Sequence, residues 1–135
     1  MATAQIVYQG NLRTQATHLA SGNTLITDAP TDNNGKGEAF SPSDLVCAAL
    51  GSCMMTIIGI VAQREDIDLS QTTIAITKTM TGTPRRIAKV AVAFTLESNV
   101  NLTDAQKEKL KRAALTCPVA LSLHPDIEQE VIFNF

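Results

Sequence analysis

The amino-acid sequence predicts a single α+β domain of 135 residues. This length suits one domain that can bury a core without metal or disulfide bonds. The composition, with 44% hydrophobic and 18% charged residues, is typical of a globular protein. Strand-like and helix-like segments lie in separate stretches: short strands, a long apolar helix, more strands, a helical stretch and a last strand. This segregation favours an α+β fold over alternating α/β units.

Three short strands are expected near the N-terminus, at residues 5–8, 11–18 and 24–27. The second of them has no helical stripe, and its threonines favour a strand. Gly10 and Asn11 tolerate positive φ angles, so they predict the turn between the first two strands. The three segments together predict an antiparallel meander.

A long helix is expected to begin at Ser41. Its hydroxyl can accept from the free amides, Pro42 suits the first helical position, and Asp44 favours the positive end of the helix. Residues 45–62 then carry no charge. Because nearly every side is apolar or small, we expect this helix to be buried all round at the centre of the fold.

The same segment is only about as long as the shortest membrane spans. Small or polar residues interrupt it, namely Gly51, Ser52, Thr56 and Gly59. We therefore interpret it as the core helix of a protein that does not enter a membrane. Gly51 and Ser52 also thin one side of the helix, where a substrate, a backbone or another helix could approach.

Two more strands are expected at residues 70–83 and 88–96, with a hairpin region at 81–84. The first alternates roughly, with Ile74 and Ile76 on one face and threonines on the other. The second alternates clearly, and its apolar face consists of Val90, Val92, Phe94 and Leu96. Both patterns predict strands of a sheet with one buried face.

The C-terminal part begins with a capping box, Thr103 followed three residues later by Gln106. An amphipathic helix is expected through Leu115, and Pro118 should end it by disfavouring helical geometry at Cys117. A short helical piece at residues 118–123 and an edge strand at 127–135 complete the expected elements.

Charge and cysteine content restrict the function. The net charge is −2, aromatic residues make up 4%, and no basic stripe occurs, which argues against a nucleic-acid partner. Residues 1–5 have neither the charge nor the apolar run of a signal peptide, so we expect a cytoplasmic protein. Its three cysteines are then expected to be reduced thiols rather than a structural disulfide framework.

Cys53 lies well inside the long apolar helix, which is the ordinary place for an inert cysteine. Burial raises the pKa of a thiol, so reactivity there would require a nearby cation. Arg13, on an early strand, is the candidate; Arg64, Arg85 and Arg86 are interpreted as surface charges. Cys47 is six residues earlier on another helix face, and we interpret it as core packing.

Cys117 has two possible environments. Because Pro118 favours the first position of a helix, Cys117 could face the free amides of that helix start, which stabilise a thiolate. Alternatively, Thr116 caps the helix and Cys117 packs inward. His124 follows Cys117 by seven residues and His18 is distant, so zinc spacing is absent and no metal is expected. No phosphate-binding loop or other cofactor motif occurs.

Two segments resemble the OsmC/Ohr family. Residues 40–53, Phe-Ser-Pro-Ser-Asp-Leu-Val-Cys-Ala-Ala-Leu-Gly-Ser-Cys, resemble its central-helix signature, and residues 116–120, Thr-Cys-Pro-Val-Ala, resemble its second cysteine motif. Their order and separation also resemble the family, and residues 12–18 resemble its general OsmC-like branch. The resemblance covers essentially the whole chain. It implies an OsmC-like fold with antiparallel sheets packed around a long buried central helix, in an intertwined homodimer with sites at the subunit interface.

The resemblance also implies the roles of individual residues. Cys53 would be the peroxidatic cysteine, Cys117 the resolving cysteine, and Arg13 the partner of the reactive thiolate. The family carries a carboxylate where this chain has Ser43, and Asp44 or Glu38 could take its place. The implied activity is reduction of organic hydroperoxides through a Cys53 sulfenic acid, with an external dithiol as reductant and no cofactor.

An apolar pocket beside the long helix would favour organic substrates over hydrogen peroxide, and its expected lining is Met54, Met55 and Phe40. Two alternatives remain open. One is a dimer that binds a small molecule and whose thiols only pack; the other is a hydrolase that uses Cys53 as a nucleophile.

Overall fold

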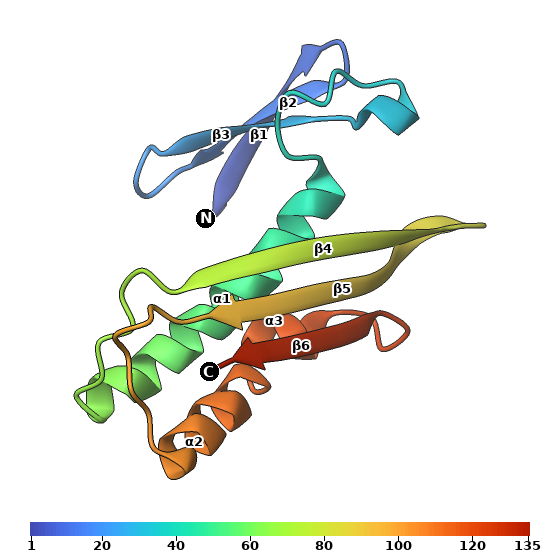
Figure 1. Cartoon of the computed structure of the whole chain (residues 1–135). Coiled ribbons are helices and arrows are strands. Elements are labelled where there is room, and N and C mark those ends of the chain that lie inside the picture. Colours follow the sequence, from blue (N-terminus) through green and yellow to red (C-terminus); the bar gives the residue numbers. More distant parts are fainter. The chain divides into compact units, whose positions relative to one another are not determined.

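The computed structural model describes residues 1–135, and the chain forms two compact units, residues 1–46 and residues 47–135. The first unit holds three strands, a short 3-10 helix and the start of the longest helix (Figure 1). The second holds the rest of that helix, three strands and two further helices. The element order is the one expected from the sequence.

The first unit contains the expected N-terminal meander. Its antiparallel sheet has the order β1-β2-β3, with β1 at Ala4–Gly10, β2 at Arg13–His18 and β3 at Thr24–Asp28. The predicted turn at Gly10 and Asn11 is confirmed, since both have positive φ angles. Leu12 also has a positive φ of 62°. The short 3-10 helix η1 follows at Thr31–Asn33.

The helix α1, Pro42–Arg64, begins as the sequence predicts. The backbone N–H of Asp44 donates to Ser41 Oγ at 3.1 Å, and the N–H of Ser41 donates to Asp44 Oδ2 at 3.0 Å. This reciprocal pair satisfies amides that have no partner inside the helix. Asp44 is therefore part of the helix cap.

The expectation that α1 is buried on every side is wrong for the single chain. One stripe is buried, consisting of Cys47, Leu50, Gly51, Met54, Ile58 and Ala62. Other positions are exposed, including Ile60, at 42% of its maximal area. The uncharged run of residues 45–62 shows only that the helix surface is apolar or small. Such a pattern cannot distinguish a surface buried within the same chain from one buried by a partner chain. By length and hydropathy alone α1 could also span a membrane, a test that core helices pass as well.

The second unit has a mixed sheet with the order β4-β5-β6. Strands β4, Thr73–Gly82, and β5, Arg85–Thr95, form the expected antiparallel hairpin. The edge strand β6, Glu128–Asn134, pairs with β5 in parallel, so the sheet is not purely antiparallel as expected. The helices between β5 and β6 carry the chain back to the end of the sheet at which β5 begins. Two adjacent strands can run in parallel only when such a crossover connects them.

The core of the second unit lies between this sheet and its helices (Figure 1). The predicted apolar face of β5 supplies Val90, Val92 and Phe94, all fully buried. Gly51 allows α1 to approach β4 closely, because a Cβ atom added there would lie 2.6 Å from Ile76 Cδ1. The small residue at position 51 therefore serves helix–sheet packing.

The two C-terminal helices are α2, Asp104–Ala114, and α3, Pro118–Ser122. The predicted capping box of α2 is confirmed by two hydrogen bonds between Thr103 and Gln106, of 2.9 and 3.1 Å. Leu110 and Ala114 of α2 are buried in the same core as α1 and β5. The chain leaves α2 at Leu115 and starts α3 at Pro118, as the proline position predicts.

Candidate functional site

Cys53 lies in the middle of α1, next to the buried stripe. Its side chain is half-buried and packs against the edge of the core, whereas Cys47 is fully buried within it. No disulfide joins any of the three cysteines. Cys53 is therefore the only cysteine whose side chain retains some exposure in the single chain.

Cys117 is the N-cap residue of α3. Its Sγ accepts a hydrogen bond from the backbone N–H of Ala120 at 3.2 Å, and Pro118 occupies the first turn. Its side chain is also fully buried. Thr116 instead donates to the carbonyl of Ala113 at 2.8 Å, at the end of α2. Cys117 thus both caps a helix and packs inward, which the sequence had left as alternatives.

Burial raises the pKa of the Cys117 thiol, and the neighbouring Cys53 side chain raises it further. The Ala120 and Val119 amides act in the opposite direction but do not outweigh burial. Of the two environments left open by the sequence, the cap alone would favour a thiolate at Cys117, but burial raises the pKa by more than the amides lower it. Cys117 is a protonated thiol near neutral pH.

The structure brings Cys53 and Cys117 together. The Cys53 side chain lies close enough to the Cys117 thiol to raise the pKa of that thiol. α1 supplies one sulfur, and the junction between α2 and α3 supplies the other. Two thiols held in this way can form a disulfide by exchange or by condensation with a sulfenic acid.

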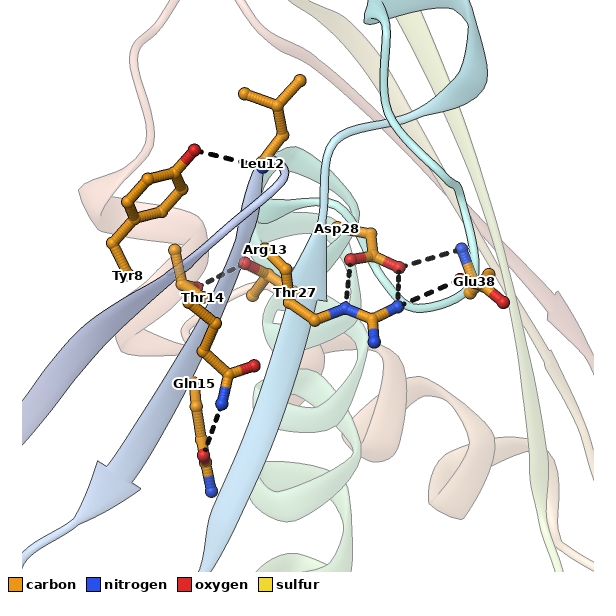
Figure 2. Close-up of polar contacts among 9 residues, drawn as sticks. Tyr8, Leu12, Arg13, Thr14, Gln15, Thr27, Asp28 and Glu38 are labelled. Atoms are coloured by element: carbon orange, nitrogen blue, oxygen red, sulfur yellow. Dashed lines mark hydrogen bonds and ion pairs between the residues drawn. The ribbon is translucent and has the colours of Figure 1, made fainter.

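Arg13 lies in the first unit, at the start of β2, in a cluster with Asp28 and Glu38 (Figure 2). Asp28 accepts from Arg13 Nε and Nη2, each at 2.7 Å, in a bidentate ion pair. Glu38 accepts from Nη2 at 3.2 Å, and its backbone N–H donates to Asp28 Oδ2 at 3.1 Å. We call these three residues the Arg13 cluster.

The ion pair shifts the pKa of both partners. The hydrogen bonds from Arg13 hold the pKa of Asp28 below its usual value, although burial acts to raise it. The Asp28 hydrogen bond in turn raises the pKa of Arg13 above its ordinary value. Both groups are therefore charged at neutral pH. The two parallel hydrogen bonds from Arg13 to Asp28 also hold the guanidinium in one orientation.

The sequence suggested Asp44 or Glu38 as the supporting carboxylate in place of Ser43, and it did not point to Asp28. Glu38 contacts Arg13, while Asp44 accepts from the Ser41 amide. Asp28 is only 1% exposed and lies directly opposite Arg13 in the β2–β3 register. The available signal was an acidic residue at the end of a short strand, since a carboxylate that becomes buried there needs a charged partner.

Other expected residues lie as follows. Arg64, Arg85 and Arg86 are exposed, in agreement with surface positions. Of the expected pocket residues, Met54 is fully buried in the core and cannot line a substrate pocket, Met55 is half-buried, and Phe40 is 57% exposed. Met54 was misassigned because a continuous apolar run does not reveal which helix face meets the sheet.

The α+β fold and the neighbouring thiols of Cys53 and Cys117 place this chain among small proteins that contain a pair of cysteines. The chain belongs to the OsmC family: the family described as OsmC-like protein matches residues 35–131. A comparison with curated proteins gave no match.

Solved structures agree with this family. A Psychrobacter arcticus 273-4 protein, provisionally described as an osmotic stress induced and detoxification response protein, is 53% identical, with 99% of this chain and 96% of that chain covered and a TM-score of 0.95. The Legionella pneumophila organic hydroperoxide resistance protein OsmC is 18% identical over 100% and 98% of the two chains, with a TM-score of 0.75.

A third structure, from Vibrio cholerae O1 biovar eltor, is provisionally described as an organic hydroperoxide resistance protein with captopril bound in one of its active sites. It is 20% identical, with 99% of this chain and 92% of that chain covered and a TM-score of 0.73. At these lower identities the likeness concerns the fold, and it confirms the OsmC/Ohr architecture expected from the sequence.

Proposed function

We propose that this protein reduces organic hydroperoxides, with Cys53 as the peroxidatic cysteine and Cys117 as the resolving cysteine. The observation that carries the proposal is the interaction between the Cys117 thiol and the Cys53 side chain. Support comes from the family, whose solved members include organic hydroperoxide resistance proteins.

The reaction follows in three steps. The Cys53 thiolate attacks one peroxide oxygen, the O–O bond breaks, and the alkoxide leaves as an alcohol after taking up a proton. Cys53 is then a sulfenic acid. The Cys117 thiol attacks its sulfur, water leaves, and a disulfide forms. An external dithiol returns both cysteines to thiols by two exchange reactions and is itself oxidised to a disulfide.

The different environments of the two thiols favour this division of roles. Cys53 is the half-buried cysteine, so a substrate can reach it more easily than Cys117. Cys117 is buried and protonated at neutral pH, so it does not compete for the peroxide. In this proposal Arg13 stabilises the Cys53 thiolate, and Asp28 and Glu38 hold Arg13.

A homodimer is the second part of the proposal. The exposed side of α1 carries small or apolar residues that do not need water, including Ala49, Ser52, Thr56 and Ile60. In the first unit, β1 leaves Ile6, Val7 and Tyr8 each more than half exposed. Such surfaces favour cover by another chain, and a second copy of this chain is the occupant that the family resemblance implies. We expect the dimer to work in the reducing cytoplasm.

The test is thiol mapping after treatment of the reduced protein with one equivalent of an organic hydroperoxide. Mass spectrometry is expected to find a Cys53–Cys117 disulfide, with Cys47 still able to react with an alkylating reagent after denaturation. If the peroxide is not consumed and Cys53 stays reduced, the proposal fails. A dimer whose thiols only pack would then be the better interpretation, because the burial of Cys117 fits that role.

A further inference from the structure

The helix α3 is very short, and the proposed resolving cysteine lies at its start. It has five residues, and Cys117 is its N-cap. A helix of this length is not stable in water without contacts to the rest of the protein. None of its residues is fully buried: Val119 and Ala120 are half-buried against the core, and Leu121 is 75% exposed. Packing therefore holds α3 on one side only.

A side chain from another element completes the hydrogen bonding of α3. The backbone N–H of Leu121 donates to the Cys117 carbonyl at 3.2 Å, which closes the helical turn. The Ala120 carbonyl lies in the last turn, where a helix has no donor of its own. This carbonyl accepts a hydrogen bond from Gln129 Nε2 at 3.0 Å. Gln129 belongs to β6, so the bond joins α3 to the sheet (Figure 1).

Gln129 is the polar member of the inner face of β6. Burial alternates along this strand, and the more buried positions are Gln129, Val131 and Phe133. Val131 and Phe133 pack against the core, whereas an amide on the same face needs a hydrogen-bonding partner. The strand is itself held by β5, where Gln129 pairs with the fully buried Val90. The bond to Ala120 therefore connects a firmly held strand to a weakly held helix.

Ala120 links Gln129 to the thiol. Its N–H donates to Cys117 Sγ at 3.2 Å, while its carbonyl accepts from Gln129. Because both groups belong to one residue of a single turn, holding the carbonyl also limits where the N–H can point. Cys117 is fully buried, so water does not compete for its sulfur. The direction of the sulfur is thus coupled to the contact between α3 and β6.

We propose that Gln129 is a positioning residue for Cys117: by holding the Ala120 carbonyl it keeps α3 in place and directs the Cys117 sulfur toward that of Cys53. The inference rests on the proposed function for the resolving role of Cys117. Gln129 acts through Ala120, by ordering α3 before the disulfide forms. Without this bond, disulfide formation must also order the helix, which costs conformational entropy.

The test is the thiol–disulfide equilibrium of the protein in mixtures of reduced and oxidised glutathione, which requires no hydroperoxide. One oxidised glutathione takes both hydrogens of the Cys53 and Cys117 thiols, which leaves the protein disulfide and two reduced glutathiones. Gln129→Met keeps a side chain of similar length but cannot donate. The equilibrium constant for the disulfide should fall about fivefold, the order of effect of one hydrogen bond. Mass spectrometry after an acid quench measures the disulfide fraction.

Ser122→Ala is the matched control. It removes the hydrogen bond of 2.7 Å from Ser122 Oγ to the Pro118 carbonyl, which lies within α3 and does not reach β6. This variant should leave the equilibrium constant unchanged. An unchanged constant in Gln129→Met, or an equal fall in Ser122→Ala, would overturn the proposal.

A second readout separates positioning from general damage to the site. The rate at which iodoacetamide alkylates Cys53 in the reduced protein should be the same in wild type and in Gln129→Met, because Gln129 acts on the other sulfur. Peptide mapping identifies the alkylated cysteine. A change in this rate as large as the change in the disulfide equilibrium would mean that Gln129 supports the whole site, which contradicts a specific role toward Cys117.

A measurement on the unmodified protein covers the case in which Gln129→Met does not fold. In NMR, the side-chain amide protons of Gln129 should exchange with water more slowly than those of Gln63, which is exposed. Equal exchange rates would refute a persistent bond to Ala120. The proposed function is tested separately: if hydroperoxide is not consumed but the disulfide equilibrium still depends on Gln129, the peroxidase proposal fails and the positioning role stands.

Discussion

The Cys117 thiol, buried at the cap of α3, lies beside the half-buried Cys53 side chain of α1. This relationship gives the two cysteines different properties within one site. The more accessible sulfur is in the middle of a long helix, and the buried, protonated sulfur is at the start of a short one. A disulfide between them would join α1 to the segment between α2 and α3.

The first prediction concerns recycling. Cys53→Ser should abolish hydroperoxide turnover, because serine cannot form a sulfenic acid. Cys117→Ser should allow one oxidation per chain and then stop, since no thiol remains beside the Cys53 sulfenic acid. Peroxide consumption with and without dithiothreitol measures both effects. Cys47→Ala is the control and should keep full turnover despite the loss of a buried sulfur. Sustained turnover by Cys53→Ser would remove the basis of the proposed function.

The second prediction concerns alkaline pH. Because the folded-state pKa of Cys117 is raised, its contribution to stability is present below the pKa of an unfolded thiol, about 8.5. Above that value the unfolded state gains from ionisation before the folded state does, so stability falls as pH rises. Urea denaturation of the reduced protein and of Cys117→Ser, from neutral pH to pH 10, measures the effect. The stability difference between the two proteins should shrink above about pH 8.5, and a constant difference would contradict burial of this thiol.

The third prediction concerns acid. The pKa of Asp28 is lowered by Arg13, so its contribution to stability is present above the unfolded-state pKa of about 3.9 and is lost as pH falls towards the lower folded-state value. Asp28→Asn removes this contribution at all pH values. Thermal midpoints should therefore differ most near neutral pH, and the gap should narrow below about pH 4. Thr27→Val, which leaves the ion pair in place, should show no such narrowing.

Much of the fold follows from local chemistry that the sequence displays. The Ser41–Asp44 cap, the capping box at Thr103 and the proline after Cys117 each fix a helix boundary within a few residues, and the structure agrees with them. The alternation of β5 likewise identifies its buried face correctly. In these cases the residues that predict the feature and the feature itself lie within one helical turn or one strand.

The remaining features depend on which segments meet, and sequence patterns do not contain that information. The parallel pairing of β6 with β5 depends on the direction in which the connecting helices return the chain, and the position of Asp28 opposite Arg13 depends on strand register. The raised pKa of Cys117 reflects tertiary burial that outweighs the local effect of a helix cap. The apolar run of α1 could not reveal that part of the helix is left uncovered by its own chain.

The last prediction tests what covers that helix. Ile60 is 42% exposed on α1, in a chain that we propose to be a homodimer. If a second copy packs on this side, Ile60→Lys would bury an unpaired charge, at a cost of about 3 kcal/mol or more. Such a cost would weaken the dimer by more than about a hundredfold.

Sedimentation velocity over a range of concentrations measures the change. Ala105→Lys, which adds the same charge at an exposed position of α2, should leave the dimer intact. A dimer of equal strength in both variants would mean that this side of α1 is not the interface. If the wild-type chain sediments as a monomer, the apolar side of α1 is exposed to solvent and the homodimer proposal is wrong. Loss of the dimer in Ile60→Lys alone would identify this side of α1 as the contact between two copies.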